Sequence, residues 1–100
     1  MRPIHLATLD RTRPVLILTR EPVRPFLKSI TVAPITSIIR GLSTEVPVGK
    51  TNGLHNDSVV SCDNITTIPR EAIGRFLGYL HPAQELALGQ AIAAAYDLGP

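Results

Sequence analysis

The sequence has no tryptophan and a single cysteine, and aromatic residues make up only 4% of its 100 residues. One cysteine, Cys62, excludes an intrachain disulfide framework, and its apolar surroundings are typical of an inert, packed thiol. With so few aromatic rings, surfaces on which successive bases could stack are scarce. Phe26, in a proline-rich stretch, is the one best placed to stack on a base, whereas packing is expected for Phe76, Tyr79 and Tyr96.

Other familiar signatures are also missing. Three scattered histidines do not have the spacing of a zinc site, and no glycine-rich phosphate-binding loop is present. No apolar run approaches the ~18 residues that cross a bilayer, and no opening stretch has the layout of a secretory signal. We therefore expect no metal, no cofactor and no membrane contact, with the cytoplasm as the default location.

The residues that are present favour short strands and turns. Hydrophobic residues make up 44% of the chain, together with 9 prolines and 7 glycines, a composition that argues against a helix bundle. One hundred residues is the usual length of one domain, so residues 1–100 are expected to form a single domain. A chain of this size buries only ~65% of its unfolded surface, and pairing with a second copy would increase that burial.

Charge is unevenly distributed along the chain. Residues 1–50 carry 8 lysines and arginines against 3 acids, whereas residues 51–100 carry 2 against 5. A basic half favours a polyanionic partner, and phosphate is the first candidate. Ordinary surface solubility explains the same distribution equally well.

Apolar segments bounded by turn residues predict strands. The segment 14–19 is apolar on both faces and is expected to be central, while 20–26, with two prolines, is expected to be a loop or an edge. Pro34 predicts a bulge or an unpaired edge inside the third strand. The remaining expected segments are strands at 2–9, 28–39, 43–48, 58–63 and 75–80, an exposed turn at 49–57, extended chain at 64–69 and one helical turn at 69–72.

One long helix is expected over residues 81–99. Pro82 suits the first helical position, His81 takes the cap position and Gly99 is a plausible stop. The helix is apolar almost all round, so it needs two covering surfaces, the sheet and a second subunit. Together the elements predict an α+β, mainly β fold, a small barrel with one C-terminal helix.

The stretch "LDRTRPVLILTRE", residues 9–21, places Arg13 directly ahead of Pro14 at the start of the central strand. An arginine at this position is either a solvated strand end or the anion-binding residue of an active site. Its guanidinium offers a planar fork to two phosphate oxygens. The residues alone leave both readings open.

Four segments, in order, resemble the MazF/PemK (Kid) family of toxin endoribonucleases. "TLDRTRPVLILTRE" resembles that family's "DLDP…RPVLVLS" opening, and "ITVAPITSIIRGLSTEVPV" its third and fourth strands. "NDSVVSCDNITTIPREAIGRFLGYL" resembles the "DSVV…DQIRTI" block, and "HPAQELALGQAIAAAYDL" the closing helix. The resemblance covers nearly the whole chain.

The resemblance implies an SH3-like barrel of the CcdB/Kid/MazF type, a homodimer with an RNA groove, and a MazE-like antitoxin whose disordered acidic tail fills that groove. It also implies metal-independent cleavage of single-stranded RNA at a short sequence. The family's catalytic pair maps onto Arg13 and onto Thr44, with Ser43 beside it. The alternative interpretation of Thr44 is a plain strand residue with good β propensity.

In such a reaction the 2′-hydroxyl of RNA attacks the adjacent phosphorus, leaving a 2′,3′-cyclic phosphate and a 5′-hydroxyl. Arg13 suits the stabilisation of transition-state charge, but arginine stays charged in proteins and is a poor base. The base is therefore not identified, and Glu45, His55 and substrate-assisted attack remain candidates. RNA contacts are expected from basic and polar residues along the chain: Arg11, Thr12, Arg20, Arg24, Phe26, Lys28, Arg40 and Ser43.

Two departures from the family pattern stand out. Relatives often carry a "GSEQ-x-G" connection after the first strand, where this chain has only residues 10–12, and His5 stands where Trp or Tyr is usual. The short connection predicts a more open groove. His5 and His81 are expected to be structural, and Asp63 and Asn64 to bond within a turn. The alternatives to a nuclease are a CcdB-like inhibitor of DNA gyrase and a non-catalytic RNA-binding module.

Overall fold

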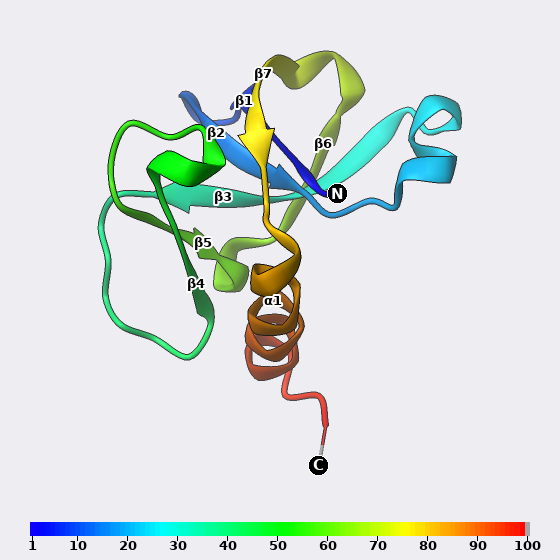
Figure 1. The fold of residues 1–100 in the computed structure, drawn as a ribbon. Helices are drawn as coiled ribbons and strands as arrows, with labels where there is room; N and C mark the ends of the chain where they lie inside the picture. The colour runs from blue at the N-terminus through cyan, green and yellow to red at the C-terminus, as the bar shows by residue number, and fades with distance from the viewer. Residues whose placement is uncertain (100) are drawn as a thin grey trace.

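The computed structural model describes residues 1–99, which form seven β-strands, four short 3-10 turns and one α-helix (Figure 1). The strands are β1 (Pro3–Thr8), β2 (Thr12–Ile17), β3 (Ser29–Thr36), β4 (Glu45–Val48), β5 (Ser58–Ser61), β6 (Thr66–Pro69) and β7 (Ile73–Tyr79). The 3-10 turns are η1 (Glu21–Phe26), η2 (Lys50–Asn52), η3 (Cys62–Asn64) and η4 (Arg70–Ala72), and the helix is α1 (Pro82–Ala95).

The strands form one antiparallel sheet in the order β4-β5-β3-β2-β1-β7, with β6 also paired to β3. In Figure 1 the sheet curls round its interior, and α1 extends away from one end of it. This arrangement confirms the expected α+β, mainly β fold, a small SH3-like barrel with a C-terminal helix. The central position expected for the second strand is also confirmed, because β2 lies between β1 and β3.

Two buried apolar clusters hold the sheet in its curved form. One joins the sheet to the helix and contains Leu16, Val60 and Leu88, each at most 1% exposed. The other lies between β2, β3 and β6 and contains Val15 and Val32, both fully buried. Alternate residues of β2 thus enter different clusters, which fixes the strand on both faces and with it the backbone at its N-terminal end.

The expectation of a bulge or an unpaired edge at Pro34 is only half right. β3 is an interior strand without a register shift, and Pro34 lies opposite Val15 of β2. On its other side, the pairing with β6 stops at Val32 and the pairing with β5 starts at Ile35. Pro34 sits in that gap between partners, so its missing N–H deprives no strand of a hydrogen bond.

Several predicted boundaries are wrong by a few residues. The fourth strand begins at Glu45 rather than at residue 43, because the chain before it turns, with the Glu45 N–H donating to the Leu42 carbonyl at 3.1 Å. The fifth strand ends at Ser61, since the next three residues form η3. The helix ends at Ala95 rather than near Gly99. Asp97 adopts a left-handed φ of 55°, and the Leu98 N–H donates to the Ala93 carbonyl at 2.8 Å.

The expected packing of the aromatic residues is also wrong in part. Phe76, Tyr79 and Tyr96 are 46%, 43% and 53% exposed, because β7 is an edge strand and Tyr96 follows the last turn of α1. The His5 ring meets the edge of Phe76 at 5.6 Å between centroids, and Phe76 lies 4.9 Å from Tyr79. These rings pack on one another at the surface. Among residues 1–99, no helix has the length and apolar character needed to cross a membrane.

Candidate active site

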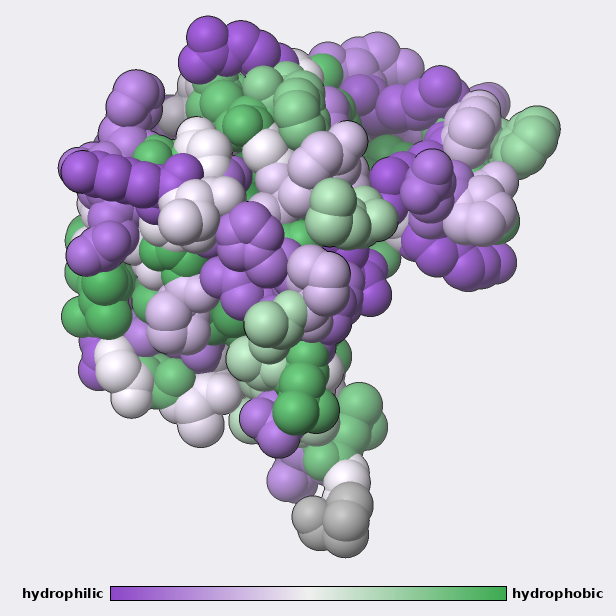
Figure 2. All heavy atoms as spheres, viewed as in Figure 1, coloured by the Kyte–Doolittle hydropathy of each residue, from purple (hydrophilic) through white to green (hydrophobic). Residues whose placement is uncertain are grey.

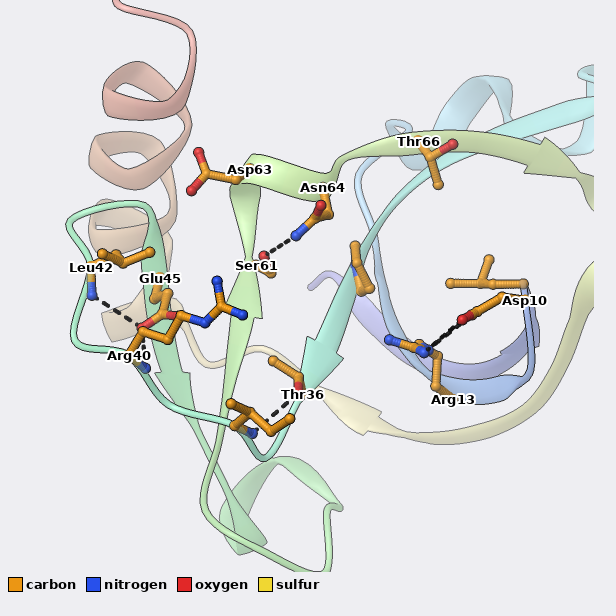
Figure 3. A pocket seen from close by; sticks show the side chains of 13 residues that line it. Asp10, Arg13, Thr36, Arg40, Leu42, Glu45, Ser61, Asp63, Asn64 and Thr66 are labelled. Atoms are coloured by element: carbon orange, nitrogen blue, oxygen red, sulfur yellow. Dashed lines mark hydrogen bonds and ion pairs between the residues drawn. The ribbon is translucent and has the colours of Figure 1, made fainter.

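A cavity of about 570 Å³ opens beside the N-terminal end of β2 (Figure 3). Its walls come from the β1–β2 connection, the end of β3, the 38–45 segment and η3, and we name it the Asp63 cavity. The charged side chains that line it are Asp10, Arg13, Arg40, Glu45 and Asp63. Uncharged lining is provided by Leu9, Pro34, Thr36, Ile38, Leu42, Ser61, Asn64 and Thr66.

A second cavity of about 350 Å³ shares Arg13 and Thr36 with the first. It is bounded by the β1–β2 connection, the end of β3 and the loop before β5, and we name it the His55 cavity. Its other lining residues are Arg11, Thr12, Pro14, Ile35, Ser37, Leu54, His55, Asn56 and Ser58. Because Arg13 and Thr36 line both cavities, they form the wall between the two.

The Arg13 guanidinium is only partly engaged by the protein. Its Nη2 lies 3.1 Å and 3.2 Å from the two carboxylate oxygens of Asp10, whose side chain is 74% exposed. An exposed pair of this kind contributes about 0–1 kcal/mol, so it does not hold the guanidinium away from an anion. Arg13 Nε is buried, and no acceptor within residues 1–99 takes its hydrogen bond. Arg13 therefore keeps donors available for a ligand.

Thr36 is a residue that the sequence interpretation missed. In the β2–β3 pairing, Val15 lies opposite Pro34, and continuing this register by two residues places Thr36 opposite Arg13. The Thr36 Oγ1 accepts a hydrogen bond from the Ile38 N–H at 3.1 Å. Its own hydroxyl hydrogen thus remains free to donate. Only the strand register, which no local pattern reveals, would have identified this residue.

Thr44, by contrast, is not among the residues lining either cavity. It lies in the turn before β4, where its hydroxyl donates to Asp63 Oδ2 at 2.7 Å and its carbonyl accepts from the Cys62 N–H at 3.0 Å. Ser43 is exposed in the same turn. The structure therefore brings Thr44 to Asp63 and does not bring it to Arg13, and its catalytic role stays a prediction.

Glu45 anchors the segment that closes one side of the Asp63 cavity. Its Oε1 accepts hydrogen bonds from the backbone N–H groups of Arg40, Gly41 and Leu42 at 3.2, 2.9 and 3.1 Å. Gly41 has a φ of +73°, which suits glycine and lets the three N–H groups converge. In Figure 3 the Arg40 side chain extends from this segment into the cavity, on the side away from Arg13.

The other predicted RNA-binding residues fall into two groups. Arg11 and Thr12 line the His55 cavity, and Arg40 lines the Asp63 cavity. The second group lies on or beside η1, which projects from the body of the molecule (Figures 1 and 2) and lines neither cavity. It consists of Arg20, Arg24, Lys28 and the 83% exposed Phe26. The structure thus does not bring this second group to Arg13.

The remaining chemistry-bearing residues are structural in their contacts. Within residues 1–99, no group of three or more His, Cys, Asp or Glu side chains is placed to hold a metal ion. Cys62 is 1% exposed, and its burial, followed by the charge of Asp63, raises the pKa of the thiol to about 11. The expected packed thiol is confirmed, although it lies in η3 and not in a strand. Asn64 bonds Ser61 within its turn, as expected.

Comparison with known families gives one match over most of the chain. The family described as PemK-like, MazF-like toxins of type II toxin–antitoxin systems matches residues 6–96. Endoribonuclease MazF3 of Mycobacterium tuberculosis is 63% identical over 98 residues, which cover 98% of this chain and 95% of that protein. Probable endoribonuclease MazF2 of the same organism is 40% identical over 79 residues, which cover 78% of each protein.

Solved structures give the same result for the fold. The Mycobacterium tuberculosis toxin MazF-mt6 superposes with a TM-score of 0.97 at 62% identity, covering 99% of this chain and 100% of that one. An endoribonuclease in complex with its cognate antitoxin, from a mycobacterial species, has a TM-score of 0.87 at 24% identity. The second match covers 98% of this chain and 94% of that chain, and it carries the fold alone.

Proposed function

Because this chain belongs to the PemK-like, MazF-like toxins of type II toxin–antitoxin systems, we propose that it cuts single-stranded RNA at a short sequence without a metal ion. At the level of its family it is an endoribonuclease toxin, like the MazF relatives it matches. We propose both the chemistry of RNA cleavage described below and that residues 1–100 form a single toxin domain.

In the proposed reaction, a ribose 2′-hydroxyl loses its proton and attacks the adjacent phosphorus. The bond from phosphorus to the 5′-oxygen breaks, and that oxygen takes up a proton. The products are a 2′,3′-cyclic phosphate and a 5′-hydroxyl. RNA supplies its own nucleophile, so the protein has to hold the phosphate and stabilise the charge that develops on it.

The observation that carries this proposal is the unengaged side of Arg13. The contacts that Arg13 makes through its terminal nitrogens are those of Nη2 with the exposed Asp10, which competes only weakly for the guanidinium, and Nη1 has no partner among residues 1–99. A phosphate beside Nη1 and Nη2 would take up these donors. Thr36, across the strand pair, supports the site because its free hydroxyl hydrogen suits a second phosphate oxygen.

We also propose a MazE-like antitoxin and a homodimer as the partners of this chain. An endoribonuclease of the same fold is known in complex with its cognate antitoxin, and the acidic tail expected of such a partner suits Arg11, Arg13 and Arg40. On the helix side, Leu86 and Leu98 are 72% and 63% exposed, which supports cover by a second copy.

The first test is incubation of the pure protein with RNA in the presence of EDTA. Cleavage that leaves 2′,3′-cyclic phosphate ends supports the proposal, and a supercoiling assay with DNA gyrase tests the CcdB-like alternative in parallel. Intact RNA together with inhibited gyrase would overturn the proposal. Intact RNA that is nevertheless bound would instead support the non-catalytic module. The endoribonuclease relatives favour cleavage.

A panel of three variants tests the assignment of residues. Arg13→Ala is expected to lower the cleavage rate about 100- to 1000-fold, as removal of one well-placed charge-stabilising donor does. Thr36→Val is expected to lower it about 10- to 100-fold, since a hydrogen bond to a charged group contributes roughly 1.5–3 kcal/mol. Thr44→Val is the matched control and should stay within about threefold of the parent, because its hydroxyl lies against Asp63.

Circular dichroism of each variant shows whether the fold survives. A large loss in Thr44→Val, with Thr36→Val fully active, would return the hydroxyl role to Thr44. Full activity in a folded Arg13→Ala variant would remove Arg13 from the mechanism.

A further inference from the structure

The proposed cleavage requires a group that accepts the proton of the 2′-hydroxyl. Neither the guanidinium of Arg13 nor the hydroxyl of Thr36 accepts a proton near neutral pH. In-line displacement also places the attacking and leaving oxygens on opposite sides of the phosphorus. A phosphate held at the wall that Arg13 and Thr36 form would therefore have one of these oxygens facing each cavity.

We propose that His55 is the general base, acting from the His55 cavity on a phosphate held by Arg13 and Thr36. This inference rests on the proposed function, since it presumes attack by the 2′-hydroxyl. Imidazole is the side chain that most often transfers protons near neutral pH, and His55 lines the same cavity as Arg13. The Asp63 cavity would then receive the leaving 5′-oxygen.

Each of the three carboxylates of the Asp63 cavity has a protein partner, and Asp10, the one that a phosphate at Arg13 would release, lies in the cavity assigned to the leaving oxygen. Asp10 is paired with Arg13, and Asp63 accepts the hydroxyl of Thr44. One oxygen of Glu45 accepts three backbone N–H groups, so that oxygen is already committed to the chain before β4. By contrast, none of the hydrogen bonds described for residues 1–99 involves the His55 ring, which is exposed.

The charges around His55 suit an RNA backbone. Arg11 from the β1–β2 connection and Arg13 from β2 line the same cavity, and no carboxylate lines it. The end of β3 contributes only uncharged residues to it. Asp57, two positions after His55, lies toward Gly49, since a Cβ built on Gly49 would be 3.2 Å from Asp57 Oδ1. The lining of the His55 cavity therefore presents no carboxylate to an anionic strand.

The loop that carries His55 is held firmly at both ends. Leu54, directly before it, is 8% exposed and belongs to the apolar cluster that contains Leu16. Ser58 is 7% exposed, and its hydroxyl donates to the Asn56 carbonyl at 3.0 Å. Further back, the buried Asn52 accepts the Gly49 N–H at 3.0 Å and donates to the Tyr79 carbonyl at 2.9 Å. A base needs this kind of fixed position.

With His55 as the general base, the protons balance over one turnover. A neutral His55 ring nitrogen takes the proton of the 2′-hydroxyl as the bond from O2′ to phosphorus forms. The bond from phosphorus to the 5′-oxygen breaks, and that oxygen takes a proton from water. His55 then returns its proton to solvent, so one turnover leaves the protein unchanged.

The test compares His55→Gln with His81→Gln, a matched change at the N-cap of α1, which lies outside both cavities. The substrate is an RNA oligonucleotide spanning a cleavage site mapped with the parent protein. His55→Gln is expected to lower kcat about 100-fold or more with little change in KM, and to remove the acidic limb of the pH–rate profile. Free imidazole should restore part of the rate to His55→Ala. The His81→Gln variant should behave as the parent.

A second substrate tests whether His55 acts as a general base or as a general acid. When sulfur replaces the bridging 5′-oxygen at the cut, the leaving group departs without protonation, so a variant lacking the acid recovers and a variant lacking the base does not. Recovery of His55→Gln on this substrate, a retained acidic limb, or a rate within threefold of the parent would overturn the inference. If the parent protein cuts no RNA, so that no cleavage site can be mapped, the proposed function fails and this inference falls with it.

Discussion

At the scale of single residues, Arg13 is positioned by its backbone more than by its charge. The preceding connection is short, Pro14 fixes the next φ, and Val15 is fully buried two residues on. Asp10 contributes an exposed pair that an incoming phosphate replaces at little cost. The position is therefore set before any ligand arrives, which is what stabilisation of a transition state requires.

Cys62 leads to a prediction about pH. Burial raises the pKa of its thiol to about 11, above the ordinary value of 9.0. The folded protein therefore holds this proton more tightly than the unfolded chain does, and the associated stability is complete below pH 9. Between pH 9 and pH 11 the unfolded thiol ionises while the folded one does not, so the free energy of unfolding should fall. Urea titrations across this range measure the slope.

Cys62→Ala is the comparison for this prediction, because its unfolding lacks the thiol contribution to that slope. Iodoacetamide provides an independent check at pH 8, where the folded protein should react slowly and the urea-unfolded protein quickly. Rapid labelling of the folded protein would contradict the burial of the thiol.

At the scale of elements, one buried amide joins three of them. Asn52 is 1% exposed, and its Nδ2 donates to the Tyr79 carbonyl at 2.9 Å and to Gln84 Oε1 at 2.8 Å. Close packing accompanies it, since a Cβ on Gly78 would lie 2.2 Å from the Asn52 carbonyl oxygen. The η2 loop, the end of β7 and the first turn of α1 are thus fixed to one another.

Asn52→Ala is expected to lower the free energy of unfolding by about 2–3 kcal/mol, because it leaves buried polar groups without partners. Urea unfolding followed by circular dichroism measures the change. Gln90→Ala, at an exposed position of the same helix, is the control and should stay within about 0.5 kcal/mol. Equal stability of the two variants would mean that the amide is not what fixes these elements.

The sequence predicts the elements well where local patterns decide them. The apolar run after Pro14 locates the start of the central strand to within two residues. The proline at position 82 is the first residue of the helix, as predicted. The end of the helix is missed because Tyr96 and Leu98 continue its apolar pattern while Asp97 leaves the helical conformation. Thr36 is missed for a different reason: its place beside Arg13 follows from strand register, a property of two distant segments.

At the scale of the whole molecule, basic residues gather in two places, around the two cavities and on η1. A short, uncleavable RNA that occupies only the cavities should bind more weakly as the salt concentration rises. Arg11→Ala should reduce the slope of log K against log salt concentration by about 0.7, the value for one phosphate contact on a single strand. Lys28→Ala should leave that slope unchanged. A longer RNA that reaches η1 should respond to both variants.

Fluorescence anisotropy over a range of potassium chloride concentrations measures these slopes. A Lys28→Ala slope that is unchanged for RNA of every length would place η1 outside the path of the RNA, and the predicted contacts there would be wrong.

The order of the sheet has a consequence for synthesis of the protein. β1 lies between β2 and β7, so the first strand of the sheet completes its pairing only after its last strand, β7, has been made. Before Tyr79 has emerged, Asn52 lacks the carbonyl that helps hold the loop bearing His55. If His55 is the base, the site is therefore complete only once β7 has been made, so a chain that stops before Tyr79 should not cleave RNA.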